Sequence, residues 1–374
     1  MKNQLKLAMA AFLCGAAILP STAQYRRTPT PNDTLQSVRT LADGSAVFSI
    51  YAPKARTVTL AGDGDLIPYF GDNRPVVKEN ANGVWEITVK DAKPGDYRYH
   101  FVVDGVNVYD PKGELASETS AIAKIGDGTE YFAMKDVPHG AVSQRYYWSE
   151  TLGTWRRMHV WTPAGFENSK KKLPVLYLIH GGGDTDNAWP GVGAAGLILD
   201  NLLAEGKMEP MIVVMPNGTV TGVPNEVPPF AQDMVKSIIP FVESNYPVLV
   251  DRNHRAIAGL SMGGMETMEV AFSNPDMFSY VWVLSSSFMP GQDPANESAR
   301  LNVKANVGKM NKNFKQMVFT QGGPSDIAYK NCENTRKQLD ADGLKYEYKE
   351  NSQAGHSWTT WRADLFDLAQ RIFK

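Results

Sequence analysis

The sequence predicts a two-part protein, in which a small all-β sandwich precedes a doubly wound α/β sheet with helices on both faces. Two patterns along the 374 residues support this fold class. From about residue 34 to residue 110, apolar and polar side chains alternate between closely spaced turn signals, as in half-buried strands. Beyond residue 140, continuous apolar runs alternate with helical patterns, which is typical of buried parallel strands and their crossover helices.

The N-terminal segment has the spacing of a β-sandwich of about 100 residues. Its alternating apolar residues are Phe48 and Ile50, Val58 and Leu60, Trp85, Ile87 and Val89, and Tyr97, Tyr99, Phe101 and Val103. Turns rich in glycine and asparagine, such as residues 80–83 and 93–96, separate these runs. Tyr69, Phe70 and Tyr109 are candidate sugar-binding aromatics, although aromatic residues of a sandwich more often pack in its core.

The C-terminal segment supplies the strands and helices of the predicted sheet. After a polar connection at about residues 112–140, buried strands are expected at residues 173–179, 211–215, 256–258, 280–284 and 317–320. Helical patterns occupy residues 231–244, 262–272 and 329–339. Open α/β sheets place their chemistry at the carboxyl ends of the strands. Reactive side chains at these strand ends are therefore the candidate functional residues.

Ser261 follows one of these strands within the pentapeptide Gly259-Leu-Ser-Met-Gly263. This pattern is typical of a nucleophile elbow, a sharp strand-to-helix turn that exposes a serine hydroxyl and leaves room only for small residues two positions to either side. The helix predicted from residue 262 directs free N–H groups and its positive dipole end at the same place, which suits a developing oxyanion. The pattern therefore predicts acyl transfer through Ser261.

His356 is the candidate general base. A serine nucleophile needs a base, and in the α/β-hydrolase chain order an acid and then a histidine follow the serine. Of the six histidines only His356 follows Ser261, and it lies in the glycine-flanked loop Gln353-Ala-Gly-His-Ser before the C-terminal helix. The order and the loop setting favour a catalytic role over a structural one.

Asp326 is the candidate orienting carboxylate. It follows the strand at residues 317–320 and the bend Gly322-Gly-Pro-Ser, from which it can reach the far ring nitrogen of His356 and hold the required tautomer. The alternative role for Asp326 is to cap the helix that begins near residue 329. The other aspartates between Ser261 and His356 lie after a helix, at the end of a helix or in a polar insertion; they are Asp276, Asp293, Asp340 and Asp342.

An oxyanion hole needs two N–H donors. The elbow supplies the N–H of Met262, and the loop His180-Gly-Gly-Gly-Asp after an earlier strand is expected to supply the second donor. Gly182 is the candidate and Gly181 the alternative, because glycine lets the backbone approach a ligand closely. His180 precedes the nucleophile and is interpreted as a residue that shapes this loop.

The N-terminus has the features of a secretory signal. A positive start, Met1-Lys-Asn-Gln-Leu-Lys, precedes an apolar run from Leu7, and small residues stand at Ser21 and Ala23. The run is about 13 residues long, whereas a membrane span needs about 20. Cleavage after Ala23 and export to the periplasm or the extracellular space are expected. Cys332 would then be the single cysteine, so no internal disulfide is expected.

The composition excludes several classes of protein. With 43% hydrophobic and 21% charged residues and a net charge of −2, the chain is globular and has no basic tract to bind nucleic acid. Neither H-E-x-x-H nor paired-cysteine spacing occurs, so no metal is implied, and a serine mechanism needs no cofactor. Nothing in the sequence indicates an oligomeric state.

With these residues in place, the chain resembles the esterase D-like, feruloyl-esterase-type carbohydrate esterases of family 1. The matching motifs occur in order over about residues 145–374, at residues 157–166, 178–184, 214–218, 239–246, 255–264 and 355–365. The resemblance implies an α/β-hydrolase fold and places the family's triad on Ser261, Asp326 and His356. The acid motif departs from the family, because Gly322-Gly-Pro-Ser-Asp lacks the usual polar stretch before the aspartate.

The N-terminal segment resembles the immunoglobulin-like module found beside the catalytic domain of many glycan-active enzymes, notably at residues 48–55, 94–99 and 103–111. Three parts are therefore expected: a signal peptide at residues 1–23, an immunoglobulin-like module at residues 25–137 and an α/β-hydrolase esterase domain at residues 140–374. Because this layout is typical of exported enzymes from bacteria that degrade plant polysaccharides, the resemblance implies an ester hydrolase that acts on acyl groups of the plant cell wall.

The acyl group is less well determined by the sequence. Trp189, Trp358 and Trp361 are near the predicted site and are candidate substrate-binding residues that stack on a cinnamoyl ring, although tryptophans are more often structural. Feruloyl esters of arabinoxylan are the first expectation, and acetyl esters of xylan are the second. The alternatives are a siderophore esterase, a non-catalytic glycan-binding protein, and acyl transfer to an acceptor other than water.

Overall fold

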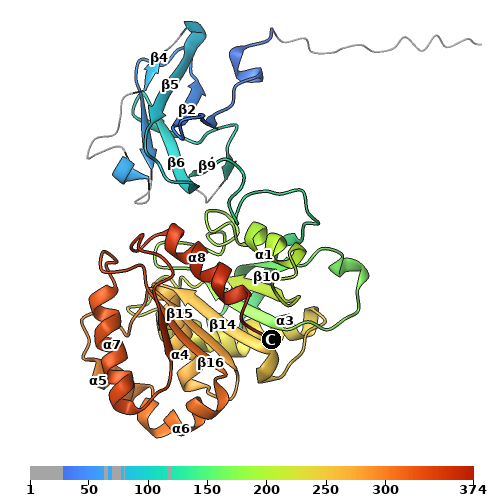
Figure 1. Cartoon of the computed structure of the whole chain (residues 1–374), viewed down its shortest axis with the longest axis vertical. Helices are drawn as coiled ribbons and strands as arrows, with labels where there is room; N and C mark the ends of the chain where they lie inside the picture. The colour runs from blue at the N-terminus through green and yellow to red at the C-terminus, as the bar shows by residue number, and fades with distance from the viewer. Residues whose placement is uncertain (1–27, 63–65, 70–76, 80, 116–119) are drawn as a thin grey trace, which may run out of the picture.

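The computed structural model describes residues 28–62, 66–69, 77–79, 81–115 and 120–374. The predicted signal at residues 1–23 and the candidate sugar contact Phe70 lie outside the described residues. Figure 1 shows two bodies, a β-rich one built from the N-terminal residues and a larger α/β one that contains the C-terminus. In the described part of the chain, no helix has both the length and the apolar character needed to cross a membrane.

The N-terminal body is a sandwich of two antiparallel sheets. One sheet has the order β1-β2-β5-β4, with bounds Val38–Thr40, Ala46–Tyr51, Val84–Val89 and Lys78–Glu79. The other has the order β3-β6-β9-β8, with bounds Val58–Gly62, Gly95–Val103, Ala121–Ile125 and Glu114–Leu115. A short strand, β7 (Val106–Val108), also pairs with β6. The predicted all-β module is therefore confirmed.

Aromatic side chains from both sheets form the core of this sandwich. Phe48, Tyr99 and Phe101 are 0% exposed, and the Tyr99 ring packs edge to face on both phenylalanines. Tyr69 packs edge to face on Tyr97, whereas the Tyr109 side chain is 43% exposed. Of these two candidate sugar contacts, Tyr69 is a packing residue and Tyr109 is the more exposed.

The structure corrects the polar connection predicted at residues 112–140. Two strands of the sandwich, β8 and β9, lie inside this segment, and β9 pairs with β6 from Gly95↔Ile125 to Tyr99↔Ala121. The hydrophobic signal of β9 is weak because its sequence, Ala-Ile-Ala-Lys-Ile, buries two alanines that carry little apolar surface. The sandwich therefore extends further along the chain than its alternating pattern indicates.

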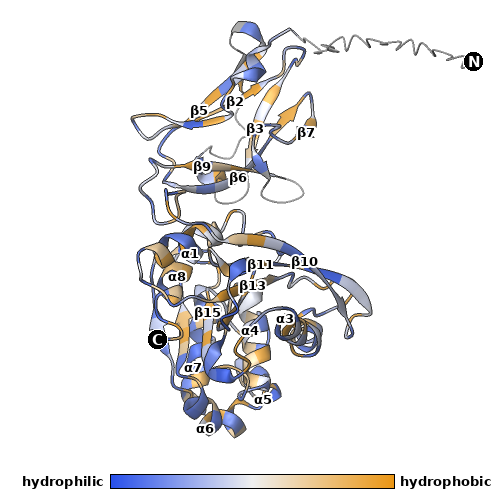
Figure 2. Cartoon of the chain, turned by 90° about the vertical axis from the view of Figure 1, so that its right-hand side faces the viewer, coloured by the Kyte–Doolittle hydropathy of each residue, from blue (hydrophilic) through white to orange (hydrophobic). Residues whose placement is uncertain are grey.

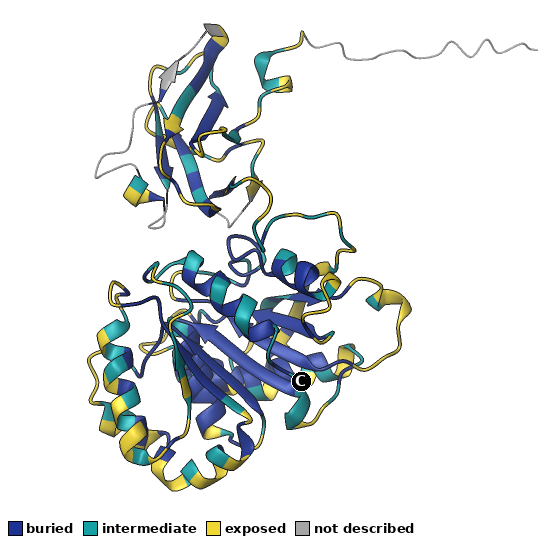
Figure 3. Ribbon diagram, in the orientation of Figure 1, coloured by how far each residue is buried: buried dark blue, intermediate teal, exposed yellow. Residues whose placement is uncertain are grey.

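The C-terminal body contains an eight-stranded mixed sheet with the order β10-β11-β13-β12-β14-β15-β16-β17. In that order the strand bounds are Ala141–Ser149, Thr154–Thr162, Ile212–Pro216, Val175–Ile179, Arg255–Leu260, Tyr280–Leu284, Gln316–Thr320 and Glu347–Lys349. β10, β11 and β13 pair antiparallel, and the strands from β13 to β17 pair parallel. The central strands are buried along their length (Figure 3), which explains their continuous apolar sequences.

Helices cover both faces of this sheet, so the predicted doubly wound α/β fold is confirmed. α1 (Ala195–Ala204) and α8 (Trp358–Ala369) lie on one face, and α3 (Ile239–Asn245) and α4 (Met262–Ser273) on the other (Figure 2). The helix predicted at residues 231–244 is interrupted, because α2 (Val227–Asp233) joins α3 through a π-helical turn. The other α-helices of the described chain are α5 (Pro294–Arg300), α6 (Val303–Asn313) and α7 (Tyr329–Asp342).

Candidate active site

Ser261 lies at the turn from β14 into α4, at the carboxyl edge of the sheet. Its backbone has φ 51° and ψ −119°, a conformation that is costly for a non-glycine residue and that the surrounding structure must enforce. Ser261 N–H donates to Leu284 O at 2.9 Å, and Ser261 O accepts from Gly264 N–H at 2.9 Å. These bonds hold the strained elbow between β15 and the first turn of α4.

Gly259 and Gly263 allow the elbow to form. A β-carbon at Gly259 would lie 2.1 Å from Gly263 O, and one at Gly263 would lie 2.3 Å from His180 O. Both overlaps would be with backbone oxygens, so a side chain at either position could be accommodated only if β14, α4 or the segment after β12 moved. Close approach therefore requires glycine at both positions, as the motif predicts.

His356 lies between Ser261 and Asp326. His356 Nε2 is 2.9 Å from Ser261 Oγ, and His356 Nδ1 is 2.8 Å from Asp326 Oδ1, both hydrogen-bond distances. Gly355, with φ 70°, bends the histidine loop, and its N–H donates to Gly322 O at 2.8 Å. The backbone thus ties the histidine loop to the loop that carries the aspartate, and the structure brings the three predicted triad residues together.

Asp326 has hydrogen-bond partners that favour its ionised form. The residue is 3% exposed, and its Oδ1 also accepts from Ala328 N–H at 2.8 Å. Burial alone would raise the pKa of the Asp326 carboxyl, but hydrogen bonds from His356 and Ala328 outweigh it and lower that pKa. An ionised Asp326 accepts the Nδ1 proton of His356 and leaves Nε2 free to accept the Ser261 proton. Ala328 is the N-cap of α7, so Asp326 also contributes to the start of that helix.

The loop after β12 lies against the elbow. A β-carbon at Gly181 would lie 3.2 Å from Ser261 Cβ, and one at Gly182 would lie 3.8 Å from Met262 Cβ. Met262 is the first residue of α4, where backbone N–H groups have no acceptor within the helix. Gly182 and Met262 therefore lie next to each other, and their N–H groups stay the candidate donors to an oxyanion formed beside Ser261.

His180 holds this loop as a neutral imidazole. Burial lowers the pKa of His180. Its Nε2 accepts from Gly218 N–H at 2.9 Å, so its Nδ1, 2.8 Å from Gly181 O, carries the proton and donates it there. Because the Gly181–Gly182 peptide bond is trans, the Gly182 N–H points opposite to the Gly181 carbonyl, away from the imidazole. This geometry agrees with the interpretation of His180 as a loop-shaping residue.

The three tryptophans predicted to bind substrate are packing residues in this structure. Trp189, Trp358 and Trp361 are 1%, 4% and 6% exposed. Their rings form an edge-to-face series with centroids 5.2 Å apart, and Trp361 packs edge to face on His356 with centroids 5.0 Å apart. They support the histidine loop. Stacking of a substrate ring on them stays a prediction, and their burial limits any such contact to the exposed ring edges.

Ser286 is a further residue of the site that the sequence patterns did not identify. Its Oγ donates to Ser261 O at 2.5 Å, and a β-carbon at Gly264 would lie 2.3 Å from its Cβ. It therefore braces the elbow from the end of β15. The signal that could have revealed it is the polar run Ser285-Ser-Ser287 directly after an apolar strand.

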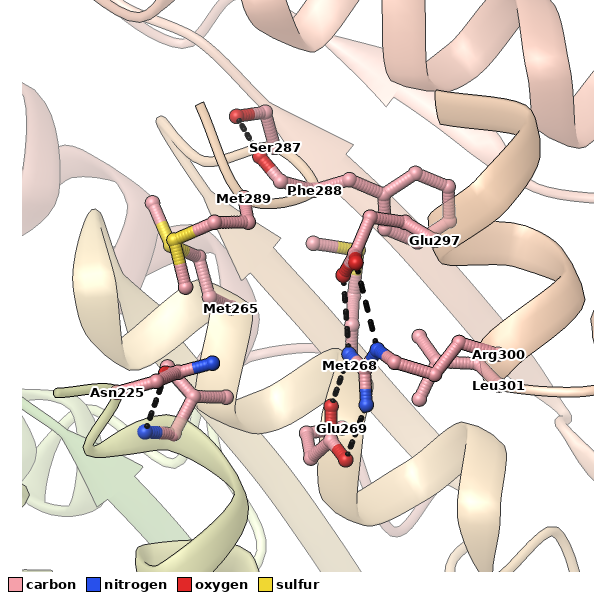
Figure 4. A pocket seen from close by; sticks show the side chains of 11 residues that line it. Asn225, Met265, Met268, Glu269, Ser287, Phe288, Met289, Glu297, Arg300 and Leu301 are labelled. Atoms are coloured by element: carbon pink, nitrogen blue, oxygen red, sulfur yellow. Dashed lines mark hydrogen bonds and ion pairs between the residues drawn. The ribbon is translucent and has the colours of Figure 1, made fainter. Parts of the chain in front are cut away.

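A shallow pocket lies beside α4. Figure 4 shows Met265 and Met268 of α4 lining it, and its free volume of about 10 Å³ has room for roughly one water molecule. Arg300 Nη2 lies 2.6 Å from Glu269 and 3.0 Å from Glu297, and this ion-pair network forms one wall (Figure 4).

Known proteins share both parts of the chain. The family model described as putative esterase matches residues 149–372, and that of carbohydrate-binding module 48, the isoamylase N-terminal domain, matches residues 36–120. A relative from Xylanibacter ruminicola, an endo-1,4-beta-xylanase/feruloyl esterase, is 31% identical over 353 residues. The match covers 89% of this chain and 45% of that relative, so the chain spans less than half of its length.

Solved structures have the same fold. A ferulic acid esterase from Anaeromyces mucronatus, in complex with ferulic acid, has a TM-score of 0.56 and 22% identity, over 66% of this chain and 95% of its own. The enterobactin esterase of Shigella flexneri has a TM-score of 0.62 and 15% identity, over 89% of this chain and 94% of its own.

Fold and site together define the class of α/β-hydrolases with a hydrogen-bonded serine, histidine and aspartate at the carboxyl edge of the sheet. Within that class, the chain belongs to the putative esterase family and carries an N-terminal module of the carbohydrate-binding module 48 type.

Proposed function

We propose that the protein is an exported serine esterase that removes feruloyl groups from plant cell-wall xylan. The observation that carries the proposal is the hydrogen-bonded series from Ser261 Oγ through His356 to Asp326, with distances of 2.9 and 2.8 Å. The name of the Xylanibacter ruminicola relative, which joins a xylanase to a feruloyl esterase, supports the choice of acyl group and polymer. The predicted signal supports export.

In the acylation step, Ser261 Oγ attacks the ester carbonyl carbon while His356 Nε2 takes the hydroxyl proton. Asp326, ionised beside Nδ1, stabilises the imidazolium that forms. The carbonyl oxygen becomes negative and is held by the N–H groups of Met262 and Gly182. The bond between the acyl carbon and the sugar oxygen then breaks while His356 gives its proton to that oxygen, so the sugar leaves as an alcohol and the acyl group stays on Ser261.

In the deacylation step, a water molecule takes the place of the sugar hydroxyl. His356 removes one of its protons as the water oxygen attacks the acyl carbon, and the same N–H groups hold the second oxyanion. Collapse of this intermediate returns the proton to Ser261 and releases ferulate. The strained elbow keeps Ser261 Oγ in place throughout both steps, because Leu284 O and Gly264 N–H bond the Ser261 backbone on either side.

The test is a comparison of kcat/KM for three esters with one preparation of the enzyme: methyl ferulate, an acetylated xylo-oligosaccharide and a catecholate–serine ester. The proposal expects the highest value for methyl ferulate. A higher value for the acetylated sugar would assign an acetyl xylan esterase. Absence of hydrolysis of any ester, including nitrophenyl acetate, would instead support a non-catalytic glycan-binding protein.

Siderophore hydrolysis is a second candidate, and one specific observation favours it. The enterobactin esterase structure matches 89% of this chain, whereas the ferulic acid esterase structure matches 66%. The two-part layout is therefore shared with the siderophore enzyme at the level of fold. A kcat/KM for the catecholate–serine ester above that for methyl ferulate would assign this activity.

A further inference from the structure

The N-terminal sandwich contacts the loop that carries the candidate oxyanion donor. Arg98, in β6, places Nη1 2.6 Å from Asp184 Oδ1, and the two side chains are 13% and 15% exposed. Asp184 ends the segment Gly181-Gly-Gly-Asp184, here called the oxyanion turn. This ion pair therefore joins the two bodies of the protein directly beside the elbow, and it is largely shielded from water.

Arg98 also reaches the segment that follows the catalytic histidine. Its Cζ lies 5.8 Å from the centroid of the Trp358 ring, a distance at which a guanidinium is attracted to the ring face. Trp358 begins α8, two residues after His356, and packs on Trp361, which in turn packs on His356. One side chain of the sandwich thus touches the oxyanion turn and the tryptophan cluster that supports the histidine.

The oxyanion turn has little rigidity of its own. Three successive glycines form it, Gly183 adopts φ 79°, and Asp184 N–H closes the turn on Gly181 O at 3.3 Å. His180 Nδ1 fixes the Gly181 carbonyl at one end of the turn. At the other end, the Asp184 side chain is held by Arg98. Thr219 Oγ1 also donates to Asp184 O at 3.2 Å, but the glycines between this point and Gly181 have no side chains to restrain them, so a shift of Asp184 is expected to rotate the Gly182 peptide and turn its N–H away from the oxyanion.

We propose that Arg98 is a positioning residue for ester hydrolysis, which acts by holding Asp184 and thereby aiming the Gly182 N–H. The proposal rests on the serine mechanism given above. It makes the N-terminal sandwich a structural part of the active site, required even for small esters that carry no sugar and that cannot reach a glycan-binding surface.

Docking of the two bodies does not depend on Arg98 alone. Arg362 of α8 donates from Nη1 to Asp96 O of β6 at 3.4 Å, across to the sandwich, and the same Nη1 is held within the C-terminal body by Val192 O at 2.7 Å. The bond from Arg362 to Asp96 O does not involve Arg98 and is expected to remain when Arg98 is replaced. Loss of Arg98 therefore releases the oxyanion turn while the sandwich stays against the catalytic domain, so positioning and docking can be separated by experiment.

The experiment measures kcat and KM for nitrophenyl acetate in the full-length Arg98→Met, Asp184→Asn and double variants. Because a small misplacement of a catalytic group has a large effect on rate, each single variant is expected to lower kcat by about tenfold or more, with KM changed less than about twofold. The double variant is expected to be no worse than the poorer single variant, since both changes break one interaction. The inhibition constant of a boronic acid, whose adduct with serine resembles the tetrahedral intermediate, should rise in proportion.

Arg39→Met is the matched control. Arg39 forms an ion pair with Glu86 in the same sandwich at 2.9 Å, but its side chain is 36% exposed and it contacts β-strand residues remote from the oxyanion turn. Its kcat should equal that of the wild type. Thermal unfolding of every variant shows whether the fold is retained. If Arg98→Met unfolds early, Asp184→Asn, which leaves the sandwich unchanged, decides the question.

An unchanged kcat in a folded Arg98→Met or Asp184→Asn variant would overturn the proposal. It would also be overturned if the fall in kcat of the double variant equalled the product of the falls in the two single variants, because the two side chains would then act independently. If the serine mechanism itself is wrong, the result differs, because the Ser261→Ala variant would then retain the kcat of the wild type. A wild-type kcat for Arg98→Met together with an inactive Ser261→Ala variant rejects the role of Arg98 alone.

Discussion

The α-carbon of Gly263 packs against the backbone oxygen of His180, so closely that a β-carbon at position 263 would lie 2.3 Å from that oxygen. Gly263 belongs to the first turn of α4, and His180 begins the loop that contains Gly182. Thr267 Oγ1 donates to Gly263 O at 2.8 Å and holds the same turn from within the helix. The elbow and the oxyanion turn are thus set against each other through backbone.

Gly263→Ala should therefore destabilise the protein. The added methyl group overpacks a backbone contact that cannot relax locally, and a loss of about 2–4 kcal/mol in the free energy of unfolding is expected from urea denaturation. Gly308→Ala is the control, because a β-carbon at that position in α6 meets nothing within 4 Å. That variant should gain about 0.5–1 kcal/mol. Equal stability of the two variants would show that the contact with His180 is not close.

Asp326→Asn should inactivate the enzyme without unfolding it. The amide keeps the shape of the side chain and can still accept from Ala328 N–H, but it no longer stabilises the imidazolium and permits the wrong tautomer of His356. A fall in kcat of about 10³–10⁴-fold is expected on nitrophenyl acetate. Asp340→Asn, at an exposed position of α7, should behave like the wild type. Similar kcat values for both variants would remove Asp326 from the triad.

Asp96 in β6 makes the stability of the protein depend on pH. It is 4% exposed, and burial raises its pKa to about 6, with Glu114 and Glu130 adding to the shift and Arg362 and Lys124 opposing it. Because folding raises this pKa, protonated Asp96 stabilises the folded state. The stabilisation that protonated Asp96 contributes is complete below the ordinary pKa of an aspartate in an unfolded chain, about 3.9. It is lost as the pH rises through about 6, the pKa of Asp96 in the folded protein.

Asp96→Asn should remove this dependence, since the amide does not ionise. Urea denaturation should show the variant to be about 2–3 kcal/mol more stable than the wild type near pH 8 and equally stable near pH 4. The control is Asp136→Asn, which replaces an exposed carboxylate in the segment between the two bodies. This variant should leave the difference in the free energy of unfolding between pH 8 and pH 4 as it is in the wild type. A stabilisation of Asp96→Asn that is the same at both pH values would contradict ionisation of a buried Asp96.

The central part of the fold and the triad could be predicted from the sequence because their signals are local. Parallel strands buried on both faces must be continuously apolar, and the elbow must have glycine at residues 259 and 263 for the steric reasons that the structure shows. His356 was predicted from its place in the chain order and from its glycine-flanked loop. Asp326 was predicted from its position after β16, and the structure places it 2.8 Å from His356 Nδ1.

Other features could not be predicted because they depend on which side chains meet in three dimensions. The β10–β11 hairpin has little hydrophobic pattern, since Trp148 and Trp155 are 49% and 67% exposed at the edge of the sheet. The contact between Arg98 and Asp184 joins residues of separate bodies, which no local pattern reports. The burial of Trp189, Trp358 and Trp361 likewise could not be predicted, because it results from the packing of their rings on one another.

The most direct test of the account is the kcat of Ser261→Ala on methyl ferulate and on nitrophenyl acetate, with thermal unfolding measured on the same samples. Removal of Ser261 Oγ takes away the nucleophile and leaves the elbow bonds to Leu284 and Gly264 in place. We predict an unchanged unfolding midpoint and a kcat lowered by at least about a thousandfold on both esters. A kcat within about tenfold of the wild type in a folded Ser261→Ala variant would contradict it.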